Sequence, residues 1–169
     1  MGGPKALVEL DGEPLVRRAL RVLADGGCAP RVVVLGAAAD AVRAVLPEDV
    51  TAAEAAEWAE GMGASLRTGM QALADSTDGA VLLSLVDLPD LVPEVVARVG
   101  RVARSPHVLA RAAYEGVPGH PVLLGRDHWP GVLESAQGDQ GARSYLSRHE
   151  VELVECGDLA TGRDVNTRA

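Results

Sequence analysis

Asp87 is the acidic residue of this sequence whose position best suits chemistry. It follows the apolar run AVLLSLV, which predicts a buried strand, and Pro89 comes two residues later. In open α/β sheets ligands bind at the carboxyl ends of the strands, and a carboxylate there can hold Mg²⁺ beside a substrate phosphate. The alternative is that Asp87 only caps a turn begun by Pro89. Asp90, three residues further on, is expected to cap a helix or to face solvent.

A second candidate is the loop EGMGASLRTG, which leads into a predicted helix. Gly61 and Gly63 would let the backbone approach a ligand, and the free N–H groups at a helix start suit an anion. Ser65 and Arg67 add polar side chains to this loop. Without further context, an ordinary turn with Ser65 as the helix N-cap explains the same residues.

Two further motifs are GVPGHP, with His120 at a strand entry, and SAQGDQGARSYL, with Asp139 and Arg143 on either side of Gly141. A lone histidine more often serves as a structural hydrogen-bond partner, and Asp139 is also a plausible helix cap. No Ser–His–Asp or Cys–His arrangement can be recognised from the spacing, so nothing specific supports a protein nucleophile. Clusters of Cys and His with metal-ligand spacing are absent from the sequence as well.

The opening segment MGGPKALVEL contains Lys5, the single lysine among 16 basic residues. A glycine pair, a proline and a lysine normally follow a buried strand that directs such a loop toward a ligand. Lys5 is therefore a candidate for contacting a ligand. The alternative is that a strong bias toward arginine happens to leave one lysine at this position.

Composition and net charge limit the classes of protein to which this chain can belong. A chain of 169 residues suits one domain with a sizeable core, and the net charge of −8 argues against a nucleic-acid surface, which needs clustered positive charge. Binding of a single nucleotide is compatible with this charge, because a few cations and a metal suffice for it. Cys28 and Cys156 are far apart in the sequence and have no metal-ligand spacing, which is typical of cysteines that remain reduced thiols. With no signal peptide and no apolar run of about 18 residues, we expect a cytoplasmic protein without a membrane segment.

The hydrophobic pattern predicts the scaffold that must position these candidates. Apolar strands alternate with amphipathic helices, which indicates a three-layer α/β/α fold with a mainly parallel, Rossmann-like sheet. The turn between the strands at 107–116 and 120–125 is expected at Gly116 to Gly119. Strands are predicted over 31–36, 49–53, 79–89, 107–116, 120–125 and 151–156, and helices over 13–27, 39–47, 64–75, 93–105, 126–135 and within 137–149.

In combination, the motifs resemble one family. The segments MGGPKALVELDGEPLV, WAEGMGASLRTGM, LLSLVDLPDLVPEVV, GHPVLLGRDHWPGV, GDQGARSYL and GRDVNT occur in the order seen in the molybdenum cofactor nucleotidyltransferases, most closely the cytidylyltransferase branch with the MobA-like NTP-transferase fold. The resemblance covers essentially the whole chain, as a single domain over 1–169. It implies a sheet of the nucleotide-diphospho-sugar transferase type. It also implies transfer of CMP from CTP to a molybdopterin-type phosphorylated acceptor, with release of pyrophosphate.

The resemblance also assigns roles to residues of this chain. Lys5 would neutralise the triphosphate, and Asp87 would hold Mg²⁺ with help from Asn166 in DVNT, whose amide carbonyl brings no charge. The nucleotide would contact Gly2, Gly3, Lys5, Gly61, Gly63, Ser65 and Arg67, and the acceptor would contact His120, Asp139, Gly141 and Arg143. A molybdoenzyme or its chaperone would be a protein partner. Since the attacking phosphate is already anionic, such a transfer needs positioning and charge neutralisation rather than an activated side chain.

The start of the chain departs from the family pattern. The family begins with a strand and a glycine-rich loop, of which only Met1 and Gly2 have counterparts here. Without that interior strand, the sheet is expected to have two unpaired edges. Two explanations are open: a start upstream of Met1, which we favour, or a truncated and inactive relative.

Two alternative functions are carried forward. One is a non-catalytic nucleotide- or cofactor-binding accessory protein, which the departure at the N-terminus favours. The other is a nucleotidyltransferase for a different phosphorylated metabolite, against which GDQGAR argues by resemblance.

Overall fold

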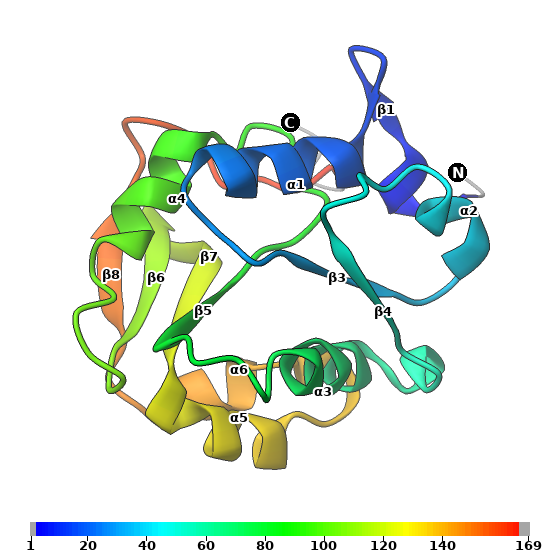
Figure 1. The fold of residues 1–169 in the computed structure, drawn as a ribbon. Coiled ribbons are helices and arrows are strands. Elements are labelled where there is room, and N and C mark those ends of the chain that lie inside the picture. The colour runs from blue at the N-terminus through cyan, green and yellow to red at the C-terminus, as the bar shows by residue number, and fades with distance from the viewer. Residues whose placement is uncertain (1–2, 166–169) are drawn as a thin grey trace.

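The computed structural model describes residues 3–165 and has three layers, with strands between two layers of helices (Figure 1). Gly2 and Asn166, both named above as ligand-binding candidates, lie outside the described residues. α1 and α4 cover one face of the strands, and α3, α5 and α6 cover the other (Figure 1). The strands are β1 (Glu9–Leu10), β2 (Glu13–Pro14), β3 (Val32–Leu35), β4 (Thr51–Glu54), β5 (Ala80–Leu83), β6 (Leu109–Tyr114), β7 (Val117–Gly125) and β8 (Glu152–Glu155). The α-helices are α1 (Leu15–Asp25), α2 (Ala39–Arg43), α3 (Met62–Ala72), α4 (Pro93–Gly100), α5 (Trp129–Ser135) and α6 (Arg143–Leu146).

The strand directions agree with a mainly parallel arrangement. β3 and β4 pair in parallel. In the larger sheet, with order β5-β7-β6-β8, the strand β7 runs antiparallel to both β5 and β6, while β8 runs parallel to β6. Consequently β5, β6 and β8 share one direction and β7 alone is reversed within this sheet. The reversal follows from the short turn between β6 and β7, because a tight turn can join only antiparallel strands.

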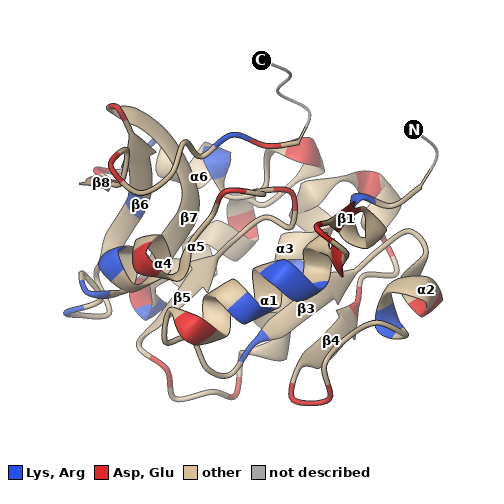
Figure 2. Cartoon of the chain, turned by 90° about the horizontal axis from the view of Figure 1, so that it is seen from above, with Lys and Arg blue, Asp and Glu red and all other residues tan. Residues whose placement is uncertain are grey.

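α1 forms where apolar residues recur at helical spacing, and its basic residues lie on its outer side (Figure 2). The buried face contains Leu15, Val16 and Leu20. Gly26 ends the helix where α1 meets α4. A Cβ on Gly26 would overlap the side chain of Val96, so only glycine permits this close packing.

The predicted helix within 137–149 is shorter than the pattern suggested. It consists of a 3-10 turn, η4 (Gly138–Gln140), followed by the four-residue α6. Gly138 and Gly141 have φ values of 55° and 52°, in the left-handed region. An α-helix cannot run through these conformations, and the glycines therefore shape a compact loop instead. The turn between β6 and β7 also lies earlier than predicted, at Glu115 and Gly116.

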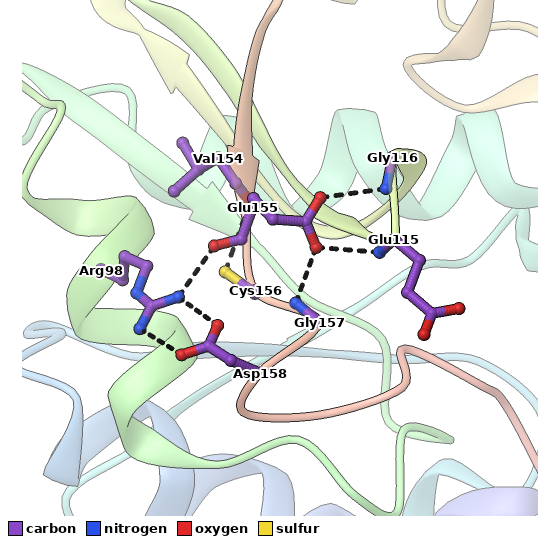
Figure 3. Close-up of polar contacts among 8 residues, drawn as sticks. All are labelled: Arg98, Glu115, Gly116, Val154, Glu155, Cys156, Gly157 and Asp158. Carbon is purple, nitrogen blue, oxygen red and sulfur yellow. Dashed lines mark hydrogen bonds and ion pairs between the residues drawn. The ribbon is translucent and has the colours of Figure 1, made fainter.

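The end of β8 fixes this turn (Figure 3). The carboxylate of Glu155 accepts hydrogen bonds from the backbone N–H groups of Glu115 at 2.8 Å and Gly116 at 3.0 Å. Hydrogen bonds from the backbone N–H groups of Gly116, Gly157 and Glu115 hold the pKa of Glu155 below its ordinary value. Arg98 of α4 forms an ion pair with Asp158 just beyond the strand. These contacts join β8, the β6–β7 turn and α4 into one edge of the molecule.

A hollow separates β3 from β5. Within residues 3–165, β3 pairs with β4 alone and β5 with β7 alone, so the edges that face each other have no neighbouring strand. A cavity of about 950 Å³ lies between them, lined by both strands and by apolar side chains of α1 and α3. All four residues of β5 remain partly exposed. The apolar run AVLLSLV predicts a buried strand. β5 is nevertheless only half-buried, because one of its edges borders the hollow.

Candidate active site

Lys5 and Asp87 form an ion pair at one end of β5. Lys5 Nζ lies 2.8 Å from Asp87 Oδ2. Asp87 is 8% exposed and is the one charged residue that is buried among residues 3–165, whereas the Lys5 side chain is 44% exposed. Because the Lys5 side of the pair is open to solvent, the pair contributes about 1 kcal/mol or less to stability. Its chief consequence is that a cation is fixed beside a buried carboxylate at the edge of the sheet where ligands bind in this class of fold.

The loop that carries Asp87 is held from two sides. Arg18 of α1 donates from Nε to the carbonyl of Pro89 at 2.9 Å and from Nη2 to the carbonyl of Leu91 at 3.1 Å. Asp90 Oδ2 accepts hydrogen bonds from the N–H and the hydroxyl of Thr161, both at 2.6 Å. Asp90 therefore anchors the C-terminal segment instead of capping a helix. These bonds set the position from which Asp87 can act.

The C-terminal segment passes directly beside Asp87. Val165, the last described residue, donates its N–H to the Asp87 carbonyl at 3.0 Å. No group of three or more His, Cys, Asp or Glu side chains among residues 3–165 is arranged to hold a metal ion. A single buried carboxylate still fits Mg²⁺, which binds proteins through one or two carboxylates and takes other ligands from water and substrate phosphates. Lys5 engages Oδ2 of this carboxylate, and the role of Asp87 in holding a metal stays a prediction.

Gly61 and Gly63 contact the loop around Gly138. Gly61 has φ 117° and ψ −171°, a conformation essentially restricted to glycine. A Cβ on Gly61 would overlap Asp139 and come within 2.7 Å of the Gly138 backbone, and one on Gly63 would lie 2.9 Å from the Ala136 backbone. Both glycines therefore allow the start of α3 to pack against the GDQGAR loop. Their role in binding a nucleotide remains a prediction.

Ser65 and Arg67 point to different surroundings. Ser65 lines the cavity, on the same helix as Met62. Arg67 hydrogen-bonds from Nη1 to the carbonyl of Ala136 and lies 3.4 Å from Glu60. Arg67 thus joins α3 to the segment before η4 and does not line the cavity. The structure separates these two residues although they are two positions apart in the sequence.

The predicted acceptor residues do come together. His120, Asp139, Gly141 and Arg143 all line the cavity. Gly3, by contrast, is exposed near Lys5 and is not part of the lining. β7 and the GDQGAR loop thus border the same cavity, and the role of these residues in binding an acceptor stays a prediction.

Burial, assisted by the positive charges of Arg111 and Arg143, lowers the pKa of His120 to about 4. Asp87 acts in the opposite direction on the same ring. At neutral pH His120 is therefore an uncharged imidazole. Its backbone carbonyl accepts a hydrogen bond from the Tyr114 hydroxyl at 2.6 Å, and His120 lies within β7 instead of at the strand entry expected from the sequence.

Arg111 is a site residue that the sequence interpretation missed. It lies in β6 and lines the cavity with His120 and Arg143. A signal was present, because Arg111 interrupts the apolar run LARAAY. Charged residues are rarely placed in a buried strand unless they are paired or have a function.

The chain resembles known proteins along most of its length. The sequence profile of the MobA-like NTP transferase domain matches residues 1–153. The nicotine blue oxidoreductase of Paenarthrobacter nicotinovorans is 37% identical over 176 residues, which cover 98% of this chain and 84% of that protein.

Solved structures share the fold. Rv0371c from Mycobacterium tuberculosis H37Rv has a TM-score of 0.79 at 26% identity, covering 92% of this chain and 80% of that one, and it has also been solved as a complex with manganese. A nucleotidyl transferase from Methanothermobacter thermautotroptrophicus has a TM-score of 0.80 at 20% identity, covering 96% and 79%. The predicted α/β fold with a mainly parallel sheet is confirmed by these likenesses and by the strand directions. Within residues 3–165, no helix is long and apolar enough to cross a membrane.

Proposed function

The chain belongs to the MobA-like NTP transferase family, and we propose that it transfers a nucleoside monophosphate from an NTP to a phosphorylated acceptor, releasing pyrophosphate. The observation that carries the proposal is the Lys5–Asp87 pair, with its N–O distance of 2.8 Å, at the ligand-binding edge of the sheet. An ammonium and a metal-binding carboxylate are the charges that a triphosphate requires in order to be held and neutralised.

In the proposed reaction an oxygen of the acceptor phosphate attacks the α-phosphorus, and the bond to the β-phosphate oxygen breaks. Lys5 binds the triphosphate and neutralises charge that develops on the pyrophosphate. Asp87 would hold Mg²⁺, which supplies a Lewis acid to the phosphate oxygens. Since the attacking oxygen is already anionic, no side chain has to remove a proton. The absence of a recognisable catalytic triad from the sequence is consistent with this scheme.

More specifically, we propose CTP as the donor, Mg²⁺ as the metal and a molybdopterin-type phosphate as the acceptor, with a molybdoenzyme or its chaperone as the protein that receives the product. The support is the motif order described for the cytidylyltransferase branch, in particular GMGASLR, GHPVLL and GDQGAR. His120, Asp139, Gly141 and Arg143 would then surround the acceptor. Gly61, Gly63, Ser65 and Arg67 would shape the nucleotide side, where Gly61 and Gly63 act by packing rather than by direct contact.

We also propose that an additional extended segment completes the sheet between β3 and β5. The two facing edges present unpaired backbone groups, and buried backbone groups are almost always hydrogen-bonded. Apolar side chains of α1 and α3 border the cavity from both sides. Because Lys5 lies beside Asp87, four residues beyond the end of β5, a strand leading into Gly3 would run in the direction of β5. It would deliver a loop to the edge of the sheet beside Asp87.

An oxidoreductase is the second candidate, which the 37% identity to nicotine blue oxidoreductase favours. Such a reaction would need an electron donor that fits the same cavity, for example a reduced nicotinamide dinucleotide. A non-catalytic nucleotide-binding protein is the third candidate. All three share a nucleotide site but differ in what happens to the bound nucleotide.

One set of assays separates these candidates. The protein is incubated with each NTP, Mg²⁺ or Mn²⁺ and a phosphorylated pterin acceptor, and pyrophosphate release is measured. The same assays are run on a form extended at its N-terminus by an apolar strand and a glycine-rich loop. Release with one NTP supports the transferase. A lack of release from both forms contradicts it, and oxidation of a reduced nicotinamide dinucleotide by an aromatic dye would instead support the oxidoreductase.

A further inference from the structure

Arg111 is a basic residue in the middle of β6. Its burial pattern differs from that of its neighbours: the other five residues of the strand are buried and Arg111 is partly exposed, at the wall of the cavity. Nε donates a hydrogen bond to the carbonyl of Gly119 at 3.0 Å. This bond fixes the plane of the guanidinium, while Nη1 and Nη2 make no hydrogen bond to any of residues 3–165.

The surroundings of Arg111 are positively charged. No carboxylate of the described segment lies within 4.0 Å of Arg111 or Arg143. Burial lowers the pKa of Arg111, and the charge of Arg143 lowers it further. Arg111, His120 and Arg143 line the same cavity as Val86, the residue that precedes Asp87.

Arg111 is a partly desolvated cation with no carboxylate of residues 3–165 within 4.0 Å, and the exposed Arg143 brings a second positive charge to the same cavity, so the charge of Arg111 is poorly compensated. An anion bound between the two guanidinium groups would compensate this charge. Phosphate is the best match, since a planar guanidinium held by one hydrogen bond still offers a fork of donors to two phosphate oxygens. The neutral His120 ring can add a donor without adding charge.

We propose that Arg111 and Arg143 bind the phosphate monoester of the acceptor. The proposal rests on the proposed function and deepens it, because it assigns the phosphate that attacks to a defined pair of side chains. The attacking oxygen has to lie beside the α-phosphate, and a site next to Asp87 meets that requirement. Lys5, which is ion-paired with Asp87, is then left for the triphosphate.

Binding measurements without turnover test this assignment. Isothermal titration calorimetry is carried out with inorganic phosphate, glycerol phosphate and CTP, each added separately. The proteins are the unsubstituted chain, Arg111→Gln, Arg111→Lys and the control Arg148→Gln. Arg148 is exposed, hydrogen-bonds to Ser144 and does not line the cavity, so its replacement removes the same charge elsewhere.

Arg111→Gln is expected to weaken glycerol phosphate and inorganic phosphate binding by about tenfold or more, since charge-assisted hydrogen bonds are lost. Arg111→Lys should restore part of the affinity, and Arg148→Gln should leave it within about twofold, as expected for screened surface charge. CTP affinity should change little in all variants. An equal loss for CTP, unchanged phosphate affinity in Arg111→Gln, or no phosphate binding by the unsubstituted protein would each overturn the proposal.

The thermal midpoint of each variant distinguishes binding from packing. If Arg111 mainly supported the fold through Gly119, Arg111→Gln would lower the midpoint in phosphate-free buffer, and this outcome counts against the proposal. Removal of an uncompensated cation should instead leave the midpoint unchanged or raise it. Arg111-dependent phosphate binding without pyrophosphate release would uphold the inference while contradicting the transferase function.

Discussion

Lys5 and Asp87 lie 82 positions apart in the sequence and meet with an N–O distance of 2.8 Å. The pair joins the first described turn of the chain to the loop after β5. The proposed triphosphate and metal sites meet at this pair.

Asp87→Asn should abolish metal-dependent pyrophosphate release, with a loss of about 100-fold or more in rate, because the amide cannot supply the charge that holds the cation. The thermal midpoint should change little, since the exposed Lys5 gains little from the pair. Asp158→Asn, which removes a remote surface carboxylate, is the matched control and should retain full turnover. If Asp87→Asn unfolds more easily but keeps its rate, Asp87 is structural.

Gly61→Ala should destabilise the protein by about 1–3 kcal/mol, because alanine is strained in this backbone conformation and its Cβ would press on Gly138. Equilibrium urea unfolding, followed by circular dichroism, measures the change. Gly100→Ala is the control, since no atom lies within 4 Å of a Cβ there and α4 ends at this residue. Alanine at position 100 should be neutral or slightly stabilising. Equal effects at both positions would contradict the packing role of Gly61.

His120 should make stability depend on pH. Its pKa is about 4 in the folded protein against an ordinary value of 6.5, so between these values the unfolded chain binds more protons. The stabilisation is fully present above about pH 6.5 and is lost as the pH falls toward 4. It amounts to about 3 kcal/mol, at 1.36 kcal/mol for each pKa unit. Urea unfolding at a series of pH values should show a shallower slope for His120→Gln, and the exposed His149→Gln should keep the original slope.

The edges of β3 and β5 should exchange their amide hydrogens faster than β6 and β7 in the 169-residue form. Amides that face the hollow have no acceptor strand among residues 3–165, whereas β6 is paired on both sides. Hydrogen–deuterium exchange read by mass spectrometry measures the difference. In a form extended by an apolar strand, protection should appear in β3 and β5 and leave β6 unchanged. Unchanged exchange in β3 and β5 after extension would contradict the proposed additional strand.

Much of the fold could be predicted because it depends on local patterns. The apolar stripe of α1 shows which face of the helix is buried. The β-branched residues of β3 indicate a buried strand, and the alternation of helices with strands indicates the layered fold. Asp87 could be placed after the apolar run AVLLSLV for the same reason, although β5 itself ends four residues earlier, at Leu83. The GDQGAR loop was harder, because the left-handed conformations of Gly138 and Gly141 break a helix that the remaining residues favour.

The sequence predicted most of the elements, their order and most of the candidate residues, since these follow from periodicity and from residue type. Which of them meet depends on the tertiary structure. Lys5 reaches Asp87, Gly61 packs against the Gly138 loop, and Arg111 enters the cavity beside Arg143 because the chain crosses over between strands that are distant in sequence. A hydrophobic pattern contains no information on such pairings. They are set by how the layers pack, which depends on the whole chain at once.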